Sequence, residues 1–405
     1  MKDFSKSTYK SFAVALAIGS TLLISSVQPA SAKQFKKLVE TGQIIPGNDR
    51  PLARIESPTI GRDGQVAVRL ETASIDTSGL AGNRSVRFIG LYSIGRGGNI
   101  SLLDKGLFTR IDRSATIDSF TAPSISQGKI AYFAYRTEIR STDATTVSTL
   151  KVGTPGDVKQ YPAITSSLYN PIRSAPRISF VNGTVYTLET GFTLSGLPTG
   201  LERVGLIDTN SPSPFFTVLS VGIENNAIRS ASQSLVLLSK ILNFSSPTTF
   251  KLLERPNGGQ FVQLNPQGKN PGSCGFAVSF ENVVSCSSEG NDYVLSARFG
   301  KKSNFVSLPL PKATTLKSVS ELSISNEKIV FKATEQGAAG AIVERIYLSN
   351  KTQVPKSVIS SGEKLDGKTI TGLSLNEDDR SIADNYVVFI ATFSDNSKAL
   401  YRADL

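Results

Sequence analysis

Carboxylates are the residues best suited to catalysis in this sequence, because its 405 residues include no histidine. A chain without histidine cannot build a Ser-His-Asp or Cys-His site, and it lacks the commonest metal ligand and neutral-pH proton shuttle. Two carboxylates about 5 to 10 Å apart would suffice for glycoside hydrolysis. No spacing singles out such a pair, so we predict no catalytic residues, no metal ligands and no cofactor, and we expect the chain not to be an enzyme.

Two short motifs invite an ion-binding interpretation. Asn376-Glu377-Asp378-Asp379 offers hard oxygen ligands for Ca²⁺, but it lacks the alternating spacing and the glycine of a calcium loop, which favours a solvated loop. Gly95-Arg96-Gly97-Gly98 is rich in glycine like a phosphate-binding loop, but such loops precede a helix. Here the motif lies between two expected strands, so we predict a hairpin turn.

The only two cysteines are Cys274 and Cys286, twelve residues apart. In an oxidising compartment they would pair, and this separation allows them to face each other across neighbouring strands. Two thiols without histidine make a poor metal site. We therefore predict a Cys274–Cys286 disulfide.

The first 32 residues have the pattern of a secretory signal peptide. Lys2, Lys6 and Lys10 precede an apolar stretch from Phe12 to Val27, and small residues end the segment at Ala32. The apolar stretch is shorter than the ~20 residues of a spanning helix, although a membrane anchor remains the alternative. We predict cleavage after Ala32, a secreted or periplasmic location, and no membrane span after cleavage.

The charge balance is mildly basic. The formal charge is +11, and it falls to +9 over 373 residues when residues 1–32 are removed. Such an excess favours contact with anionic surfaces such as acidic polysaccharide, cell wall or lipid headgroups. Because an exported chain rarely meets nucleic acid, we expect no nucleic-acid partner, and we expect a monomer.

The elements that would position any site form a repeat. Seven copies of a short hairpin, with an apolar residue before a V/I-x-aromatic or aliphatic pair, recur at a mean spacing near 54 residues, at Ile60, Ile125, Ile178, Ile228, Val278, Ile324 and Ile382. Each copy except the last is followed by a middle strand and a closing strand, and one closing strand, Phe35–Val39, precedes them all.

This order predicts an all-β fold, namely a β-propeller of seven four-stranded blades. The N-terminal strand would pair beside Leu400–Ala403 and close the last blade, which removes both exposed sheet edges. Residues 33–405 would then form one domain. A pair of β-sandwiches, a β-helix, and propellers of six or eight blades are the alternatives.

Three segments carry a family resemblance: TGQIIPG at Thr41–Gly47, SPTIGRDGQVAV at Ser57–Val68, and GLYSI at Gly90–Ile94. They resemble secreted bacterial, cyanobacterial-type tandem-repeat proteins of the NxxGxxAF type, with Asp63 in place of the usual Asn. The match is clear in the first and last copies and poor between them. The resemblance implies export and a propeller-like repeat, and it implies no activity.

We expect an exported binding or surface-interaction module whose partner is a glycan or a protein. The first alternative is a hydrolase or lyase that acts on extracellular polysaccharide through carboxylates in the central funnel, and the second is a structural envelope protein. Propellers usually bind through loops on one face. Polar inserts near Ala73–Arg84 and Thr193–Thr199 are the longest expected loops.

Overall fold

A computed structural model of the chain describes residues 34–405 except 80–81, 112–113, 140–143, 162–176, 193–197, 212–215, 224, 232–233, 242–248, 257–261, 280–281, 291, 302, 312–314, 338–339 and 377–379. Gln34–Leu405 forms one compact unit. The predicted signal peptide, residues 1–32, lies outside the described residues. Within the described residues there is no α-helix, and hence no helix that could cross a membrane.

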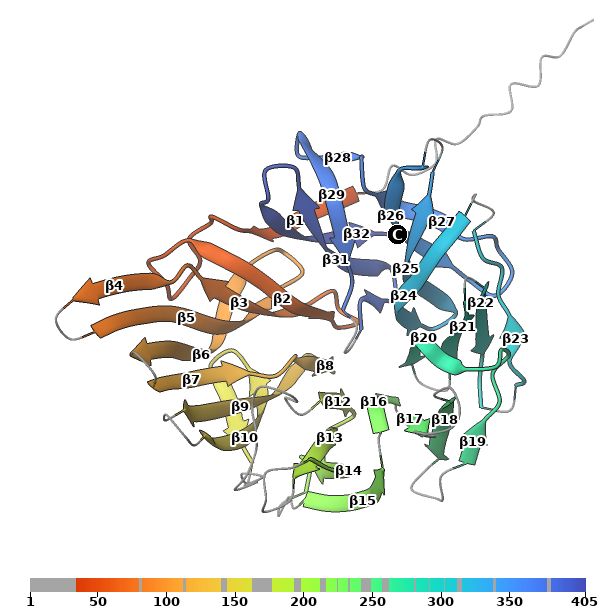
Figure 1. Cartoon of the computed structure of the whole chain (residues 1–405), viewed down its shortest axis with the longest axis horizontal. Helices are drawn as coiled ribbons and strands as arrows, with labels where there is room; N and C mark the ends of the chain where they lie inside the picture. The colour runs from red at the N-terminus through yellow and green to blue at the C-terminus, as the bar shows by residue number, and fades with distance from the viewer. Residues whose placement is uncertain are drawn as a thin grey trace, which may run out of the picture. The chain divides into compact units, whose positions relative to one another are not determined.

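Four sheets have four antiparallel strands each (Figure 1). The first two contain β12 (Arg177–Val181), β13 (Thr184–Phe192), β14 (Pro198–Asp208) and β15 (Phe216–Ile223), then β16 (Asn225–Ala231), β17 (Ser234–Ile241), β18 (Thr249–Pro256) and β19 (Val262–Leu264). The next two contain β20 (Pro271–Ser279), β21 (Asn282–Glu289), β22 (Asp292–Arg298) and β23 (Val306–Ser307), then β24 (Thr315–Ser325), β25 (Lys328–Gln336), β26 (Ile342–Ser349) and β27 (Lys356–Ser360).

A ten-stranded sheet holds the first two hairpin copies together. Its strands are β2 (Leu52–Ile60), β3 (Val66–Thr72), β4 (Ile75–Gly79), β5 (Gly82–Ile94), β6 (Ile100–Ile111), β7 (Ser114–Phe120), β8 (Ser124–Ser126), β9 (Lys129–Ile139), β10 (Ala144–Thr154) and β11 (Asp157–Gln160). The two halves join because β6 runs on to Ile111 and pairs with β7. Within the predicted loop Ala73–Arg84, β4 pairs with β5, so the expectation of a loop there was wrong.

The last sheet has six strands: β1 (Gln34–Glu40), β28 (Lys364–Leu365), β29 (Lys368–Ser374), β30 (Ile382–Ala383), β31 (Tyr386–Phe393) and β32 (Lys398–Asp404). In it, β1 pairs antiparallel with β32, so that Phe35 lies opposite Ala403 and Val39 opposite Leu400. The N-terminal strand of the described chain therefore lies in the same sheet as its last strands.

All seven predicted hairpins are present as strand pairs. Ile60 pairs with Val66 in the first copy, Ile324 with Ile329 in the sixth, and Ile382 with Val387 in the last. Asn182 and Gly183 join β12 to β13 and both have positive φ angles, of 48° and 82°. Turns of this type match the twist of the strands that they connect.

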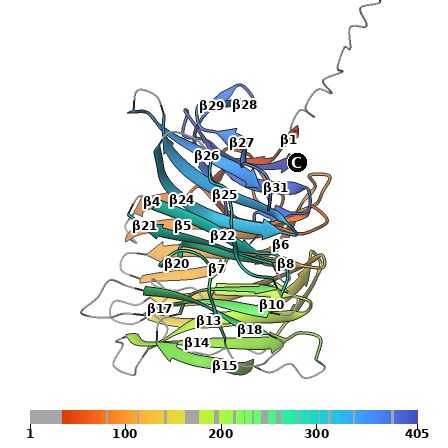
Figure 2. The same ribbon diagram turned by 90° about the vertical axis from the view of Figure 1, so that its right-hand side faces the viewer.

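The apolar residues of the hairpins form the core between successive sheets. The side chains of Ile60, Ile125, Ile324 and Ile382 are fully buried. The first strands of the hairpins also contact one another in chain order, from β8 through β12, β16, β20 and β24 to β30, while β2 contacts both β8 and β31. The result is a propeller-like arrangement of sheets, which Figures 1 and 2 show from two directions.

Candidate functional site

The predicted disulfide is present. Cys274 on β20 and Cys286 on β21 are bonded, with their Cα atoms 5.2 Å apart. Cys286 lies opposite Gly275, the neighbour of Cys274, at an irregularity in the β20–β21 pairing. The bond therefore joins the first two strands of one sheet.

Of the two motifs considered for ion binding, only the glycine-rich one is fully described. Gly95 to Gly98 form the hairpin turn between β5 and β6, as predicted, and the N–H of Gly98 donates to the carbonyl of Gly95 at 2.8 Å. Residues 377–379 of the acidic motif lie outside the described residues. Among the residues that are described, no three His, Cys, Asp or Glu side chains gather as a metal site.

A cleft of about 470 Å³ opens inside the ten-stranded sheet. Strands β6 and β7 pair from Phe108 and Ile117 to the turn between them. On the other side of Phe108 and Ile117 the two strands diverge, because β6 stays paired with β5 while β7 pairs with β9. Gly106 permits their close approach at this point, since a Cβ atom there would collide with the carbonyl oxygen of Asp118. The cleft thus lies between β6 and one face of the β7–β9–β10 strands.

A carboxylate held by two donors lies in this cleft. Asp104 on β6 accepts hydrogen bonds from Lys151 Nζ at 2.6 Å and from the hydroxyl of Tyr132 at 3.0 Å. Burial, and then the charge of Asp104, raise the pKa of Tyr132, so its hydroxyl stays protonated and donates. The Asp104 carboxylate is therefore oriented by two donors.

The rest of the cleft combines exposed charge with apolar surface. Arg136 is 60% exposed, and its Nε lies 4.0 Å from Asp118 and 3.3 Å from Glu138. Phe120 and Ala134 are register partners and line the same cleft, as does Val147, which is 49% exposed. The cleft can therefore offer donors, acceptors and the aliphatic side chain of Val147 to one ligand.

Serine hydroxyls join successive sheets at two places. Ser124 and Ser126 of β8 accept the backbone N–H groups of Phe180 and Asn182, each at 3.0 Å. In the same way Ser323 and Ser325 of β24 accept the N–H groups of Ser381 and Asp384, each at 3.0 Å. We call these two arrangements the serine clamps; they satisfy backbone donors that no strand pairing reaches.

Ion pairs accompany these contacts. Arg69 on β3 bonds to Glu56 and donates to the carbonyl of Phe120 on β7 at 2.8 Å. Lys332 on β25 pairs with Glu321, whose carboxylate accepts the N–H of Leu375 at 2.5 Å. Charged side chains, one basic and one acidic, thus bond to backbone groups more than 50 residues along the chain.

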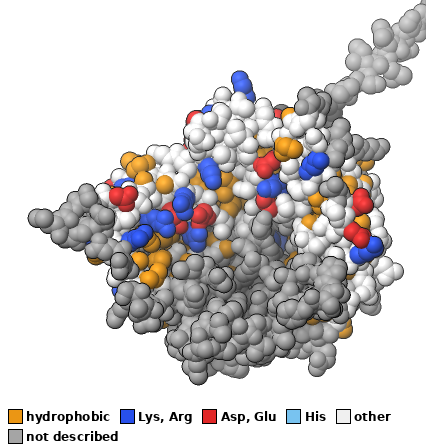
Figure 3. All heavy atoms as spheres, viewed as in Figure 1, with side chains coloured by type: hydrophobic (Ala, Val, Ile, Leu, Met, Phe, Trp, Pro, Cys, Tyr) orange, Lys and Arg blue, Asp and Glu red, His pale blue; other side chains and the backbone are white. Residues whose placement is uncertain are grey.

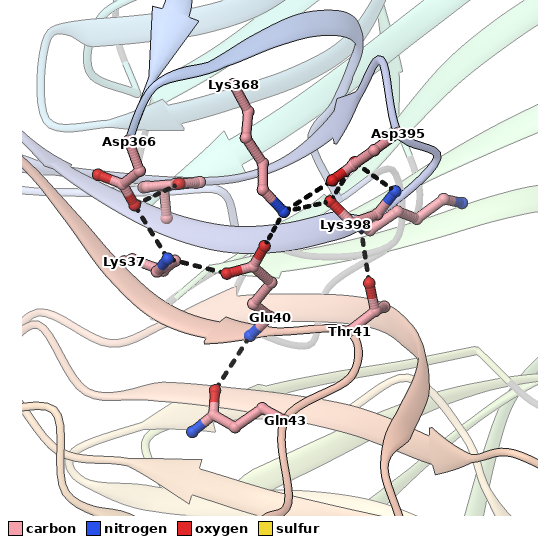
Figure 4. Close-up of polar contacts among 10 residues, drawn as sticks. Lys37, Glu40, Thr41, Gln43, Asp366, Lys368, Asp395 and Lys398 are labelled. Atoms are coloured by element: carbon pink, nitrogen blue, oxygen red, sulfur yellow. Dashed lines mark hydrogen bonds and ion pairs between the residues drawn. The ribbon is translucent and has the colours of Figure 1, made fainter.

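A separate network surrounds the β1–β32 pairing (Figure 4). Glu40 of β1 accepts from Lys37 at 2.8 Å and from Lys368 of β29 at 2.6 Å. Lys37 also lies 3.1 Å from Asp366, and Lys368 lies 2.9 Å from Asp395. Hydrogen bonds from the two lysines lower the pKa of Glu40, and the Glu40 bond raises the pKa of Lys37.

No protein-family model matches the chain, and no curated protein matches it. Among solved structures, it is similar to the β-propeller domain of the Trilobed protease from Pyrococcus furiosus, at 14% sequence identity and a TM-score of 0.50, over 87% of this chain and 93% of that one. The chain has a β-propeller fold.

Two peptidases also match the structure of this chain, with lower TM-scores. An acylaminoacyl peptidase from Pyrococcus horikoshii is 12% identical at a TM-score of 0.44, over 67% of this chain and 42% of that one. A puromycin-hydrolysing peptidase from Mycobacterium tuberculosis is 11% identical at a TM-score of 0.44, over 84% and 57%. The chain spans less than two thirds of either peptidase.

Sequence reasoning did not find the cleft or the serine clamps of the propeller. The clamps had a visible signal, because Ser124-Ile125-Ser126 and Ser323-Ile324-Ser325 repeat in two hairpins, each with a lysine three residues later. The cleft had none, since Asp104 and Lys151 are 47 residues apart and meet only because β6 diverges from β7.

Proposed function

We propose that the chain is a seven-bladed propeller closed by its N-terminal strand. The four separate four-stranded sheets, the two halves of the ten-stranded sheet and the strands β29–β31–β32–β1 would be the seven blades. Three observations support this: seven hairpins, the contacts of their first strands from one sheet to the next, and the β1–β32 pairing. Ring closure would leave neither end of the array of blades as an unpaired edge.

We propose further that this propeller is exported and acts as a binding module. The signal-peptide pattern of residues 1–32 and the Cys274–Cys286 bond support a secreted or periplasmic location. The resemblance of the first and last repeats to secreted tandem-repeat proteins supports the same location.

The observation that carries the binding proposal is the cleft beside Asp104. It is concave, and it has an oriented carboxylate, the exposed side chains of Arg136 and Val147, and the partly buried Thr149. Ligand sites combine these features. A glycan fits best, because its hydroxyl groups can use both donors and acceptors while its ring carbons cover Val147. A polar protein segment is the alternative ligand.

A calorimetric screen of oligosaccharides against the exported chain tests this proposal. Arg136→Ala should weaken binding of the selected sugar at least about tenfold, because a hydrogen bond to a charged group contributes about 1.5–3 kcal/mol. Lys269→Ala is the matched control, since Lys269 is exposed, pairs with Glu289 at 2.7 Å and lies just before β20, outside the ten-stranded sheet. Equal losses in both variants, or no sugar that binds, would contradict the glycan proposal.

Hydrolysis of a polysaccharide is the second candidate, and one observation favours it. Asp104 and Asp118 both line the cleft, so two carboxylates face one volume. In that case Asp118→Asn should abolish release of reducing ends while the variant still binds the sugar. Binding without turnover in the unchanged chain would leave the non-enzymatic binding module.

A further inference from the structure

One part of the ten-stranded sheet extends beyond its neighbours. It consists of β4, the first half of β5 (82–88) and the end of β6 (107–111), and we call it the projecting ribbon. Figure 1 shows β4 and β5 reaching outward past the other sheets. Among the described strands, β4 pairs only with β5, so the ribbon ends in an open edge.

One face of the projecting ribbon is apolar. Ile75 lies opposite Val86, and Phe88 lies opposite Leu107, while Ile111 lies opposite Arg84. Residues opposite each other in antiparallel strands share a face of the sheet. Ile75, Leu107 and Ile111 are 39%, 42% and 47% exposed, and they make up three of the eight large exposed hydrophobic residues found in the described chain.

This face continues a buried one. Nearer the centre, Phe88 and Tyr92 on the same face of β5 pack against the core that the first hairpin shares with the last sheet. Beyond Phe88 the covering residues end and the aliphatic side chains meet solvent. The exposed aliphatic patch is thus continuous with core surface, as at interaction sites.

Basic side chains lie on this face, at Arg84 opposite Ile111, and beside it. Arg84, Lys105 and Arg110 are exposed on or beside the ribbon, and Asp76 is the exposed acid on β4. Figure 3 shows charged and hydrophobic side chains mixed on the side of the molecule that holds β2 to β6. Basic residues beside exposed aliphatic ones complement a surface that is anionic outside and apolar beneath.

We propose that the projecting ribbon docks onto an anionic phospholipid membrane surface. A polysaccharide offers no continuous apolar surface to cover Ile75, Leu107 and Ile111. A folded protein partner would need a complementary shape, and the ribbon is a narrow projection without an aromatic anchor at its exposed positions. A bilayer needs neither, because aliphatic side chains enter its interface while arginines contact lipid phosphates.

Cosedimentation with vesicles tests the proposal, using the exported chain with vesicles of phosphatidylglycerol and phosphatidylcholine, or of phosphatidylcholine alone. The chain should bind the anionic vesicles, and high salt should weaken the binding. Leu107→Asp with Ile111→Asp should lower the partition at least about tenfold, since two aliphatic contacts are lost. Arg84→Glu should lower it by a smaller factor.

The matched control is Ile342→Asp with Val354→Asp, because these residues are 60% and 48% exposed but lie outside the ribbon. An equal loss in the control, no loss in the ribbon variant, or no binding to anionic vesicles would overturn the proposal. Dimerisation abolished by the ribbon changes, without vesicle binding, would also overturn it and assign the face to a second copy of the chain. The proposal does not depend on the cleft, so sugar binding and vesicle binding can fail separately.

Discussion

Two junctions of the propeller contain ion pairs that differ in burial: one pair is buried, and the other pairs form a partly exposed network. Between the β16–β19 and β20–β23 sheets, Arg298 donates two hydrogen bonds to Glu254, at 2.6 and 2.8 Å, and the two side chains are 7% and 5% exposed. Around the β1–β32 pairing, the charged side chains of Lys37, Glu40 and Lys368 are 20–38% exposed and share several partners.

The two junctions differ in the environment of the charge that remains after one ion-pair partner is substituted. Removing one member of a buried pair strands a charge in the interior, which costs far more than the pair itself contributes. In a solvated network, water and the remaining partners compensate. The β1–β32 junction also has backbone hydrogen bonds from the strand pairing. The first junction is therefore sensitive to single substitutions, and the second is tolerant.

Arg298→Ala should have the largest effect. It removes the guanidinium that neutralises the buried Glu254 carboxylate and should lower the free energy of unfolding by about 3–5 kcal/mol, measured by urea denaturation. The double change Arg298→Met with Glu254→Gln should cost clearly less, because it removes both charges. A single-variant loss below about 1 kcal/mol would mean that the pair is solvated, which contradicts the contrast.

The Cys274–Cys286 disulfide lies in the same sheet as Arg298, and removing it shows how much it stabilises that sheet. Replacing Cys274 and Cys286 by serine should cost about 2–3 kcal/mol, because the bond closes a loop of 12 residues in the unfolded chain. The midpoint of thermal unfolding should fall equally for the unchanged chain in reducing agent. A midpoint that is unaffected by reduction would show that the hairpin is held by its strand pairing alone.

The parts of the fold that depend on local pattern were predictable. Buried residues such as Ile60 and Ile324 recur with their hairpins, so apolar spacing found all seven strand pairs. The joined ten-stranded sheet was not predictable, because nothing in β6 or β7 alone indicates that they pair. Likewise, Lys368 and Glu40 are 328 residues apart, so no local signal connects the charges of the β1–β32 junction.

The serine clamp at Ser323 should contribute less to stability than the buried ion pair and more than the exposed network. Ser323→Ala leaves the buried N–H groups of Ser381 and Ile382 without their acceptor and should cost about 1–3 kcal/mol in urea unfolding. Ser285→Ala is the control, since that buried hydroxyl has no hydrogen-bond partner in the described part of the chain, and its loss should be near zero. Similar values for the two variants would mean that the clamp adds no stability.

The smallest effect is expected at Glu40, and it should depend on pH. The pKa of Glu40 is lowered from its ordinary value of 4.5, mainly by the bond from Lys368 and then by that from Lys37. A depressed carboxylate pKa adds stability that is fully present above about pH 4.5 and is lost as the pH falls through the folded value.

Glu40→Gln should therefore cost less than about 1 kcal/mol at neutral pH, since the network is partly exposed. The difference between this variant and the unchanged chain should shrink as the pH falls below about 4.5, and it should also shrink in high salt. Unfolding curves measured across this pH range compare the two. A loss that matched that of Arg298→Ala, or one independent of pH, would show that the β1–β32 junction also rests on a single buried contact, and the two junctions would no longer differ in kind.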